Sequence, residues 1–172
     1  MMTESPMVCR TIADFGDPTT IDRWQVVNDG VMGGLSRGNI IQDGGAMGFA
    51  GTINTDGGGF SSIQMPARGL LDGARMIRVT MRGDARDYQL SLRSDARRWG
   101  RSVAYRASLR REPGADGWSV ATVSLDKLEP SIFGQRVRAP DFDPAATQLL
   151  GFILADGRDG DFAMRVRKIE AC

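Results

Sequence analysis

The chain has 172 residues, about the size of one domain, and its 22 basic and 21 acidic residues leave a net charge of +1. This balance excludes a global field that would draw the protein to nucleic acid or to an anionic membrane, so we expect no nucleic-acid partner and peripheral membrane contact at most. The chain has no histidine, which excludes Ser-His and Cys-His nucleophilic catalysis.

Targeting signals and cysteines bear on the location of the protein and on metal binding. No apolar run approaches the roughly 20 residues that span a bilayer, and residues 1–7 do not resemble a signal peptide. We therefore expect one soluble domain over residues 1–172 in a bacterial cytoplasm. Cys9 and Cys172 are too few for a zinc site. Pairing of the first and last strands would bring them together, but a reducing compartment favours free thiols over a disulfide. No metal or other cofactor is predicted.

In chain order, a short helical turn is predicted at residues 19–24, and a packed loop follows at residues 24–38. The loop's glycines permit positive φ or close backbone approach, its Asn and Asp can hydrogen-bond the main chain, and its Trp and Met need apolar cover. These residues are Trp24, Asn28, Asp29, Gly30, Met32, Gly33 and Gly34. Two interpretations remain open, because the loop either closes one end of the fold or presents a binding surface. The second would use Asp29, Met32 and Ser36 with the backbone of Gly33 and Gly34.

Alternating apolar residues predict half-buried strands, and turns rich in glycine and proline separate them. The strands are predicted at residues 39–42, 47–53, 60–65, 77–81, 88–92, 103–109, 118–125, 149–155 and 162–166. A second short helical turn is predicted at residues 143–147. The fold class that this pattern indicates is all-β, an antiparallel β-sandwich of two sheets with one or two short helical turns.

Two polar segments lie between these strands. Residues 57–60 lack the lysine and the following helix of a phosphate loop, so a bulge at the entry to a strand is favoured. Residues 82–88 form a charged corner that contains Arg82, Asp84 and Tyr88. The corner is either an internal ion-pair turn or a polar binding site beside the first loop.

Arginine dominates the strand faces that are predicted to point outward. Only two of the 22 basic residues are lysine, and the outward arginines are Arg78, Arg82, Arg93, Arg106, Arg110, Arg165 and Arg167. Such a face suits an acidic protein surface, because arginine makes bidentate contacts and stacks on aromatic rings. Solvated charges paired across strands are the simpler interpretation.

Several motifs run through the chain in a fixed order. They are Trp24 with Asn28-Asp29-Gly30-Val31-Met32-Gly33-Gly34-Leu35-Ser36, then Gly57-Gly58-Gly59-Phe60-Ser61-Ser62, and then Arg82-Gly83-Asp84-Ala85-Arg86-Asp87-Tyr88. Together they resemble the signature of the complex I intermediate-associated protein 30 family. The chain departs from that signature where Asn54 is displaced by an extra glycine and where Ala85 replaces a glycine. The resemblance implies a galactose-binding-like jelly roll and a role in the assembly of respiratory complex I.

Three functional classes follow. We favour a non-catalytic binding or assembly module that acts through protein contacts, with complex I subunits or assembly intermediates as partners. The alternative is a carbohydrate-binding module of the galactose-binding-like class, sometimes with a structural calcium, which would make a glycan a possible partner. A hydrolase would need Asp29 and a second carboxylate, from Asp56, Asp84 or Asp87, in one cleft. The candidate binding residues are Trp24, Asn28, Asp29, Met32, Gly33, Gly34, Ser36, Phe60, Arg82, Asp84 and Tyr88.

Overall fold

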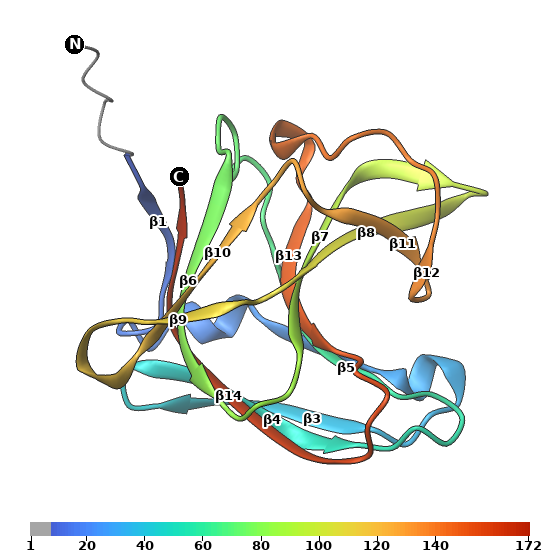
Figure 1. Cartoon of the computed structure of the whole chain (residues 1–172), viewed down its shortest axis with the longest axis horizontal. Helices are drawn as coiled ribbons and strands as arrows, with labels where there is room; N and C mark the ends of the chain where they lie inside the picture. Colours follow the sequence, from blue (N-terminus) through green and yellow to red (C-terminus); the bar gives the residue numbers. More distant parts are fainter. Residues whose placement is uncertain (1–7) are drawn as a thin grey trace.

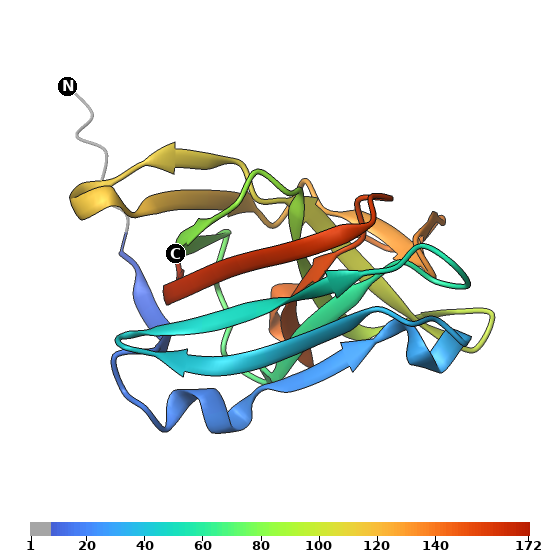
Figure 2. The same ribbon diagram turned by 90° about the horizontal axis from the view of Figure 1, so that it is seen from below.

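Two antiparallel β-sheets pack face to face in the computed structural model, which describes residues 8–172 (Figures 1 and 2). Sheet A contains, in spatial order, β3 (Arg37–Asp43), β4 (Ala46–Ile53), β14 (Gly160–Ala171), β6 (Met76–Gly83), β10 (Ser119–Ser124) and β9 (Arg111–Pro113), and β1 (Arg10–Asp14) also pairs with β14. Sheet B contains β12 (Gln135–Arg136), β11 (Glu129–Ile132), β8 (Arg101–Ser108), β7 (Tyr88–Arg98), β13 (Leu149–Leu154), β5 (Ser61–Pro66) and β2 (Gln25–Asn28). The predicted two-sheet antiparallel sandwich is confirmed.

Short 3-10 helices supply the helical turns. The described residues contain η1 (Thr20–Arg23), η2 (Asp29–Met32), η3 (Ala115–Gly117) and η4 (Pro144–Ala146). Both predicted turns, at residues 19–24 and 143–147, are present as η1 and η4. The prediction of a loop throughout residues 24–38 is wrong at its two ends, because β2 and the start of β3 are strands. The strands that the sequence analysis missed, β1, β2, β9, β11 and β12, are short and show little alternation.

The core lies between the sheets and follows from alternation along each strand. Leu90 and Leu92 of β7 are fully buried against the other sheet, as are Phe152 of β13 and Val79 of β6. Successive side chains on a strand point to opposite faces. On β7 and β13, the residues between these core positions therefore point away from the core. They build the outer face of sheet B, on which the candidate site lies.

The last strand, β14, ties the two ends of the chain together. Its first part pairs with β4, and its last residues pair with β1 at Arg10↔Ala171 and Asp14↔Lys168. This pairing brings Cys9 and Cys172 within bonding distance, and they form a disulfide. The expectation of free thiols is therefore wrong. Disulfides persist mainly in oxidising compartments, which is a reason to test the expected cytoplasmic location.

Within residues 8–172, no helix has both the length and the apolar character needed to cross a bilayer.

We predict that loss of the disulfide lowers the stability of the fold. The bond closes a loop with a sequence separation of 163 residues, so its removal frees most of the unfolded chain and costs about 2–5 kcal/mol of unfolding free energy. Urea unfolding of the intact protein, with and without a reducing agent, measures this difference. In the Cys172→Ser variant the reducing agent should have no further effect, and an intact protein that is equally stable in both conditions would contradict the prediction.

Candidate binding site

The buried carboxylate of Asp29 is the centre of the loop that the sequence singles out. Asp29 has no exposed surface, and it lies in η2 directly after β2. One of its oxygens accepts a hydrogen bond from the backbone N–H of Ser36 at 2.9 Å. The other accepts from the N–H groups of Gly59 at 2.7 Å and Phe60 at 3.3 Å. One side chain therefore joins η2, the start of β3 and the segment that leads into β5.

Two glycines leave the space that this carboxylate fills. A Cβ atom at Gly34 would lie 2.3 Å from Asp29 Cγ, and one at Gly58 would lie 2.5 Å from Asp29 Oδ2. Residues 57–60 therefore do surround an anion, but the anion is the protein's own carboxylate. The sequence analysis expected a simple strand-entry bulge here. Glycine at both positions is required by close approach to Asp29.

Burial and hydrogen bonding act in opposite directions on the pKa of Asp29. Burial raises the pKa, since it disfavours the charged form, but the hydrogen bonds from Ser36, Gly59 and Phe60 outweigh it and hold the pKa below its ordinary value. The group is therefore ionised at neutral pH and accepts hydrogen bonds from three internal donors. This bonding gives Asp29 a bracing role, which corresponds to the interpretation in which the loop closes one end of the fold.

The other residues of the loop divide between the core and the surface. Trp24 is buried, with its ring stacked on Phe152 at a centroid distance of 5.8 Å. Ser36 is also buried, and its hydroxyl accepts from the N–H of Asn54. Met32 is different, because half of its surface is exposed. The loop thus presents Met32 to the solvent while its polar groups point inward.

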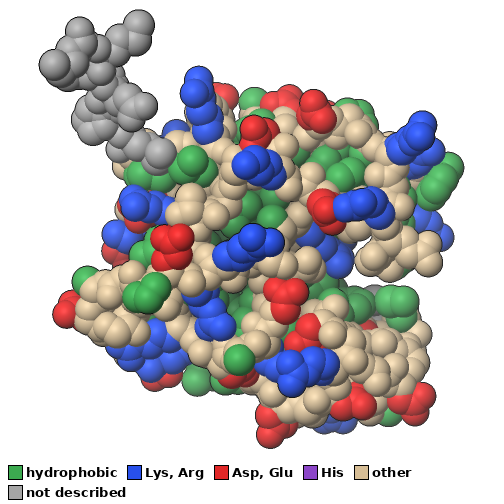
Figure 3. Space-filling model, viewed as in Figure 1, with side chains coloured by type: hydrophobic (Ala, Val, Ile, Leu, Met, Phe, Trp, Pro, Cys, Tyr) green, Lys and Arg blue, Asp and Glu red, His purple; other side chains and the backbone are tan. Residues whose placement is uncertain are grey.

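Met32 lies on the rim of a groove of about 530 Å³ on the outer face of sheet B. Phe60 also lines the groove, as does Phe133 in the turn between β11 and β12. In the space-filling view the outline of the molecule is notched between the lobe that carries β11 and β12 and the lobe that carries η2 (Figure 3). A second hollow of similar volume, about 510 Å³, is lined by residues that include Gln89, Arg110 and Lys127.

The groove floor is a row of residues that face one another across four strands. Gln64 of β5 lies opposite Gly151 of β13, Gly151 lies opposite Ser91 of β7, and Ser91 lies opposite Arg106 of β8. Only glycine fits at position 151, because a Cβ atom there would lie 2.1 Å from the carbonyl oxygen of Ile63. The floor is therefore flat at its centre and polar along one line, with apolar side chains on either side.

Two arginines on this floor are partly desolvated and lack acidic partners in the groove. Arg93 donates to the carbonyl oxygen of Ser102 at 3.2 Å, and Nε of Arg106 is buried without a hydrogen-bond partner among the described residues. Burial lowers the pKa of both guanidinium groups, and the charge of Arg93 lowers that of Arg106 further. The residues that line the groove include no aspartate or glutamate. The groove therefore offers positive charge to an anionic group of a ligand.

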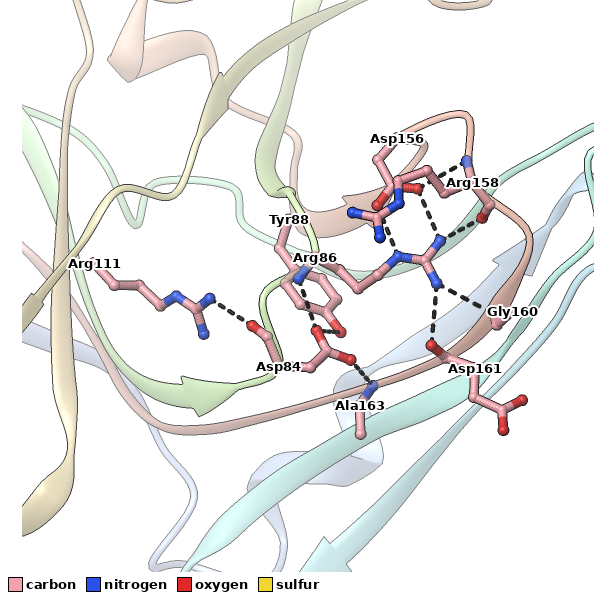
Figure 4. A network of polar contacts seen from close by, with 9 residues as sticks. All are labelled: Asp84, Arg86, Tyr88, Arg111, Asp156, Arg158, Gly160, Asp161 and Ala163. Atoms are coloured by element: carbon pink, nitrogen blue, oxygen red, sulfur yellow. Dashed lines mark hydrogen bonds and ion pairs between the residues drawn. The ribbon is translucent and has the colours of Figure 1, made fainter.

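The charged corner at residues 82–88 is an internal network (Figure 4). Arg86 uses all five of its donors: two bonds to the Asp156 carboxylate, at 2.7 and 2.8 Å, and one to each carbonyl oxygen of Arg158, Gly160 and Asp161. The side chains of Arg86 and Asp156 are only 9% and 7% exposed. This pair fastens the turn after β6 to the turn after β13.

Asp84 and Tyr88 complete the same corner. The Asp84 carboxylate accepts from the Tyr88 hydroxyl at 2.9 Å and from the N–H of Ala163 at 2.8 Å. Burial raises the pKa of Tyr88 well above its ordinary value, and the hydrogen bond to Asp84 raises it further. Of the two interpretations of this corner, the geometry corresponds to the internal ion-pair turn, since Asp84 and Tyr88 already have hydrogen-bond partners inside the protein.

The structure therefore separates the eleven candidate residues. Met32 and Phe60 line the groove. Arg82 lies on sheet A, where its guanidinium packs 4.4 Å from the ring centre of Trp118. Gly33 is exposed and ends η2 in the left-handed conformation. The remaining candidates bond within the loops or fill the core; they are Trp24, Asn28, Asp29, Gly34, Ser36, Asp84 and Tyr88.

Arg93, Arg106 and Phe133 are groove residues that the candidate list missed. For the two arginines, the alternation of apolar residues in β7 and β8 already predicted an outward face. Phe133 lies in a turn, which alternation does not describe. What the sequence lacked was strand adjacency, since β7 pairs with β13 as well as with β8. Within residues 8–172, no group of three or more carboxylates or cysteines is placed to hold a metal ion.

The sequence and the fold were compared with known proteins. The family model described as complex I intermediate-associated protein 30 matches residues 13–166, which is most of the chain. The chain belongs to this family. No curated protein matches the sequence significantly.

The solved structures similar to this fold include carbohydrate-binding modules and agarases. The family 11 module from Clostridium thermocellum, solved with a β-1,3-1,4-mixed-linked tetrasaccharide, aligns with a TM-score of 0.66 and 13% identity over 97% of this chain and 96% of that chain. The family 11 module of a cellulosomal cellulase of the same organism aligns with a TM-score of 0.67 and 13% identity over 97% of this chain and 95% of that chain. At this identity the likeness shows the fold alone, which agrees with the implied galactose-binding-like sandwich.

We predict that Asp29→Asn destabilises the fold by about 2–4 kcal/mol, because an amide cannot accept all the hydrogen bonds that the carboxylate accepts. The pKa of Asp29 is lowered on folding. Its contribution is therefore complete above about pH 4, near the unfolded value, and is lost as the pH falls through the folded pKa. Urea unfolding as a function of pH should show the gap between the intact protein and the variant narrowing in acid. Asp72→Asn, at an exposed carboxylate, is the control, and an equal loss in both variants would contradict the prediction.

We predict that Arg86→Lys costs about 2–4 kcal/mol of unfolding free energy, because lysine cannot replace the bidentate contact and the three carbonyl bonds. Arg136→Lys is the matched control, since Arg136 pairs with Glu129 at a site where the side chains are 74% and 64% exposed. The control should change stability by less than about 1 kcal/mol. Chemical unfolding of both variants measures the difference, and comparable effects would show that the network of Arg86 adds little.

Proposed function

We propose that this chain is a non-catalytic assembly module that binds an extended segment of a protein partner in the groove of sheet B. The observation that carries the proposal is the groove itself, with apolar side chains on its rim and two partly buried arginines on a floor that lacks carboxylates. Membership in the complex I intermediate-associated protein 30 family supports subunits or assembly intermediates of respiratory complex I as the partner.

The chemistry of the groove favours a polypeptide. Val27, Met32 and Leu149 offer aliphatic surface, and Phe60 and Phe133 add aromatic surface. Apolar side chains spaced along an extended chain fit such a surface, and an acidic side chain among them would meet Arg93 and Arg106. The width of seven strands in sheet B provides room for a segment to lie across it.

The positions of the carboxylates support a binding role over hydrolysis. Hydrolysis of a glycosidic bond uses two carboxyl groups on either side of the substrate. Asp29 is buried beneath the loop, and Asp84 is bonded to Tyr88 and Ala163 in the corner network. The residues that line the groove bring no carboxylate to a substrate there.

Glycan binding is a second candidate, and one observation favours it. Trp99 is 74% exposed with the guanidinium of Arg98 4.7 Å from its ring centre, and exposed tryptophan rings stack on sugars. The similar family 11 module was solved with a tetrasaccharide bound. Trp99 is not among the residues that line the groove, however, so the groove itself supports the protein partner better.

The test is affinity capture from native cells, with identification and quantification of the complex I subunits that are recovered. A groove variant, Met32→Ser with Arg106→Gln, should recover about tenfold less than the intact chain. Ile41→Ser with Arg78→Gln removes an exposed apolar group and an arginine from sheet A, and this control should recover the intact amount.

The same experiment can refute the proposal. Equal recovery of complex I subunits by the intact chain and the groove variant would exclude the groove as the binding site. Recovery of no complex I subunit, together with retention of the intact chain on a mixed-linkage β-glucan, would favour the glycan candidate.

A further inference from the structure

Two neighbouring hairpins of sheet B carry aromatic residues in an unfavourable backbone conformation. The β7–β8 turn consists of Trp99 and Gly100, between the paired residues Arg98 and Arg101. Trp99 has φ = +53° and Gly100 has φ = +72°. Two-residue turns of this type require positive φ at both positions and favour Asn-Gly or Asp-Gly, because a bulky side chain is disfavoured there.

The β11–β12 turn has the same pattern, an aromatic residue followed by glycine with positive φ at both. It consists of Phe133 and Gly134, with φ of +50° and +76°, between the paired residues Ile132 and Gln135. An aromatic residue again occupies the position where asparagine would fit best. Two such turns in one sheet are a feature that local folding preferences do not explain.

Core packing does not explain the two aromatic residues either. Trp99 is 74% exposed and Phe133 is 63% exposed, although most large apolar side chains of the described residues are buried. Backbone strain combined with exposed aromatic surface is typical of a binding site, because the fold gains nothing from either.

One arginine packs against each of the two aromatic rings. Arg98 lies 4.7 Å from the ring centre of Trp99, and Arg101 lies 4.9 Å from that of Phe133. Arg101 thus links the first hairpin to the second. We call the set of Arg98, Trp99, Arg101 and Phe133 the arginine–aromatic tip. Residues 97–101 and 132–138 together contain five arginines and no acidic residue, and of these arginines Arg136 is paired with Glu129 of β11.

We propose that the arginine–aromatic tip anchors an acidic segment of the protein partner whose remainder lies in the groove. This inference rests on the proposed function and extends it. Phe133 belongs to both surfaces, since it also lines the groove, so one continuous segment can contact both. Tryptophan and arginine dominate the strongest contacts of protein interfaces, and the excess of arginine selects a partner with negative charge.

The test uses variants that should weaken binding without harming the fold. Trp99→Asn and Phe133→Asn place the preferred residue in each turn, so the thermal midpoint of unfolding should stay equal or rise by about 2–4 °C. A merely structural role of the aromatic residues predicts a fall in the midpoint. Arg98→Glu with Arg101→Glu reverses the charge of the tip and forms the third variant.

The probe is a phage-displayed library of random 16-residue peptides, selected on the intact chain. We expect the selected peptides to be rich in Asp and Glu among apolar residues. Synthetic copies of them should bind Trp99→Asn and Phe133→Asn roughly 10- to 100-fold more weakly than the intact chain, and the charge-reversed variant more weakly still. Binding that is unchanged in all three tip variants would overturn the inference.

A groove variant separates this inference from the proposed function. Peptides that lose affinity for Arg93→Gln with Arg106→Gln, yet bind the tip variants normally, would leave the proposed function standing and refute the anchoring role. Enrichment of no peptide on the intact chain would refute both. Two further probes cover other anionic partners: tip-dependent binding of phosphatidylglycerol vesicles or of a mixed single-stranded RNA, without acidic peptides, would also overturn the inference.

Discussion

The Asp29 carboxylate is the constraint on which the groove depends. It holds η2, the start of β3 and the entry to β5 together through donors on Ser36, Gly59 and Phe60. Because Met32 belongs to η2 and Phe60 begins the segment that enters β5, the same bonds set the positions of both groove residues. The carboxylate itself stays inaccessible. A motif that looks like a ligand-binding loop therefore fixes the backbone that carries two residues of the proposed groove.

The corner network extends this bracing along the same end of the sandwich. Arg86 and Asp156 join the β6–β7 turn to the β13–β14 turn, and Asp159 in the second turn accepts a hydrogen bond from the N–H of Thr55 at 2.7 Å. Thr55 precedes the glycines that surround Asp29 and also lines the groove. Two internal ionic centres thus hold adjoining loops through backbone donors and acceptors. Buried ionic groups are favourable only when their hydrogen bonds are satisfied, and both centres meet that condition through the main chain.

The sequence predicted the sandwich because alternation is a local property that β6, β7, β8 and β14 display clearly. It also located the loop around Asp29 and the corner around Asp84. It could not decide which polar groups face inward, because the bonds of Asp29 reach residues 30 and 31 positions away in the chain. The groove floor was equally inaccessible, since Ser91 and Arg106 become neighbours of Gly151 and Gln64 only through the order of the strands. Short edge strands such as β12 lack the length that alternation needs.

The two sides of the groove differ in how well their residues suit the local backbone conformation. On the side of η2, glycines occupy the positions where close approach demands them, and the buried carboxylate has every bond it needs. On the side of the hairpins, Trp99 and Phe133 occupy positions where glycine or asparagine would be more stable. Natural proteins keep such unfavourable choices where function depends on them. The braced side therefore fixes the shape of the groove, and the strained side carries the exposed aromatic and cationic groups of the proposed anchor.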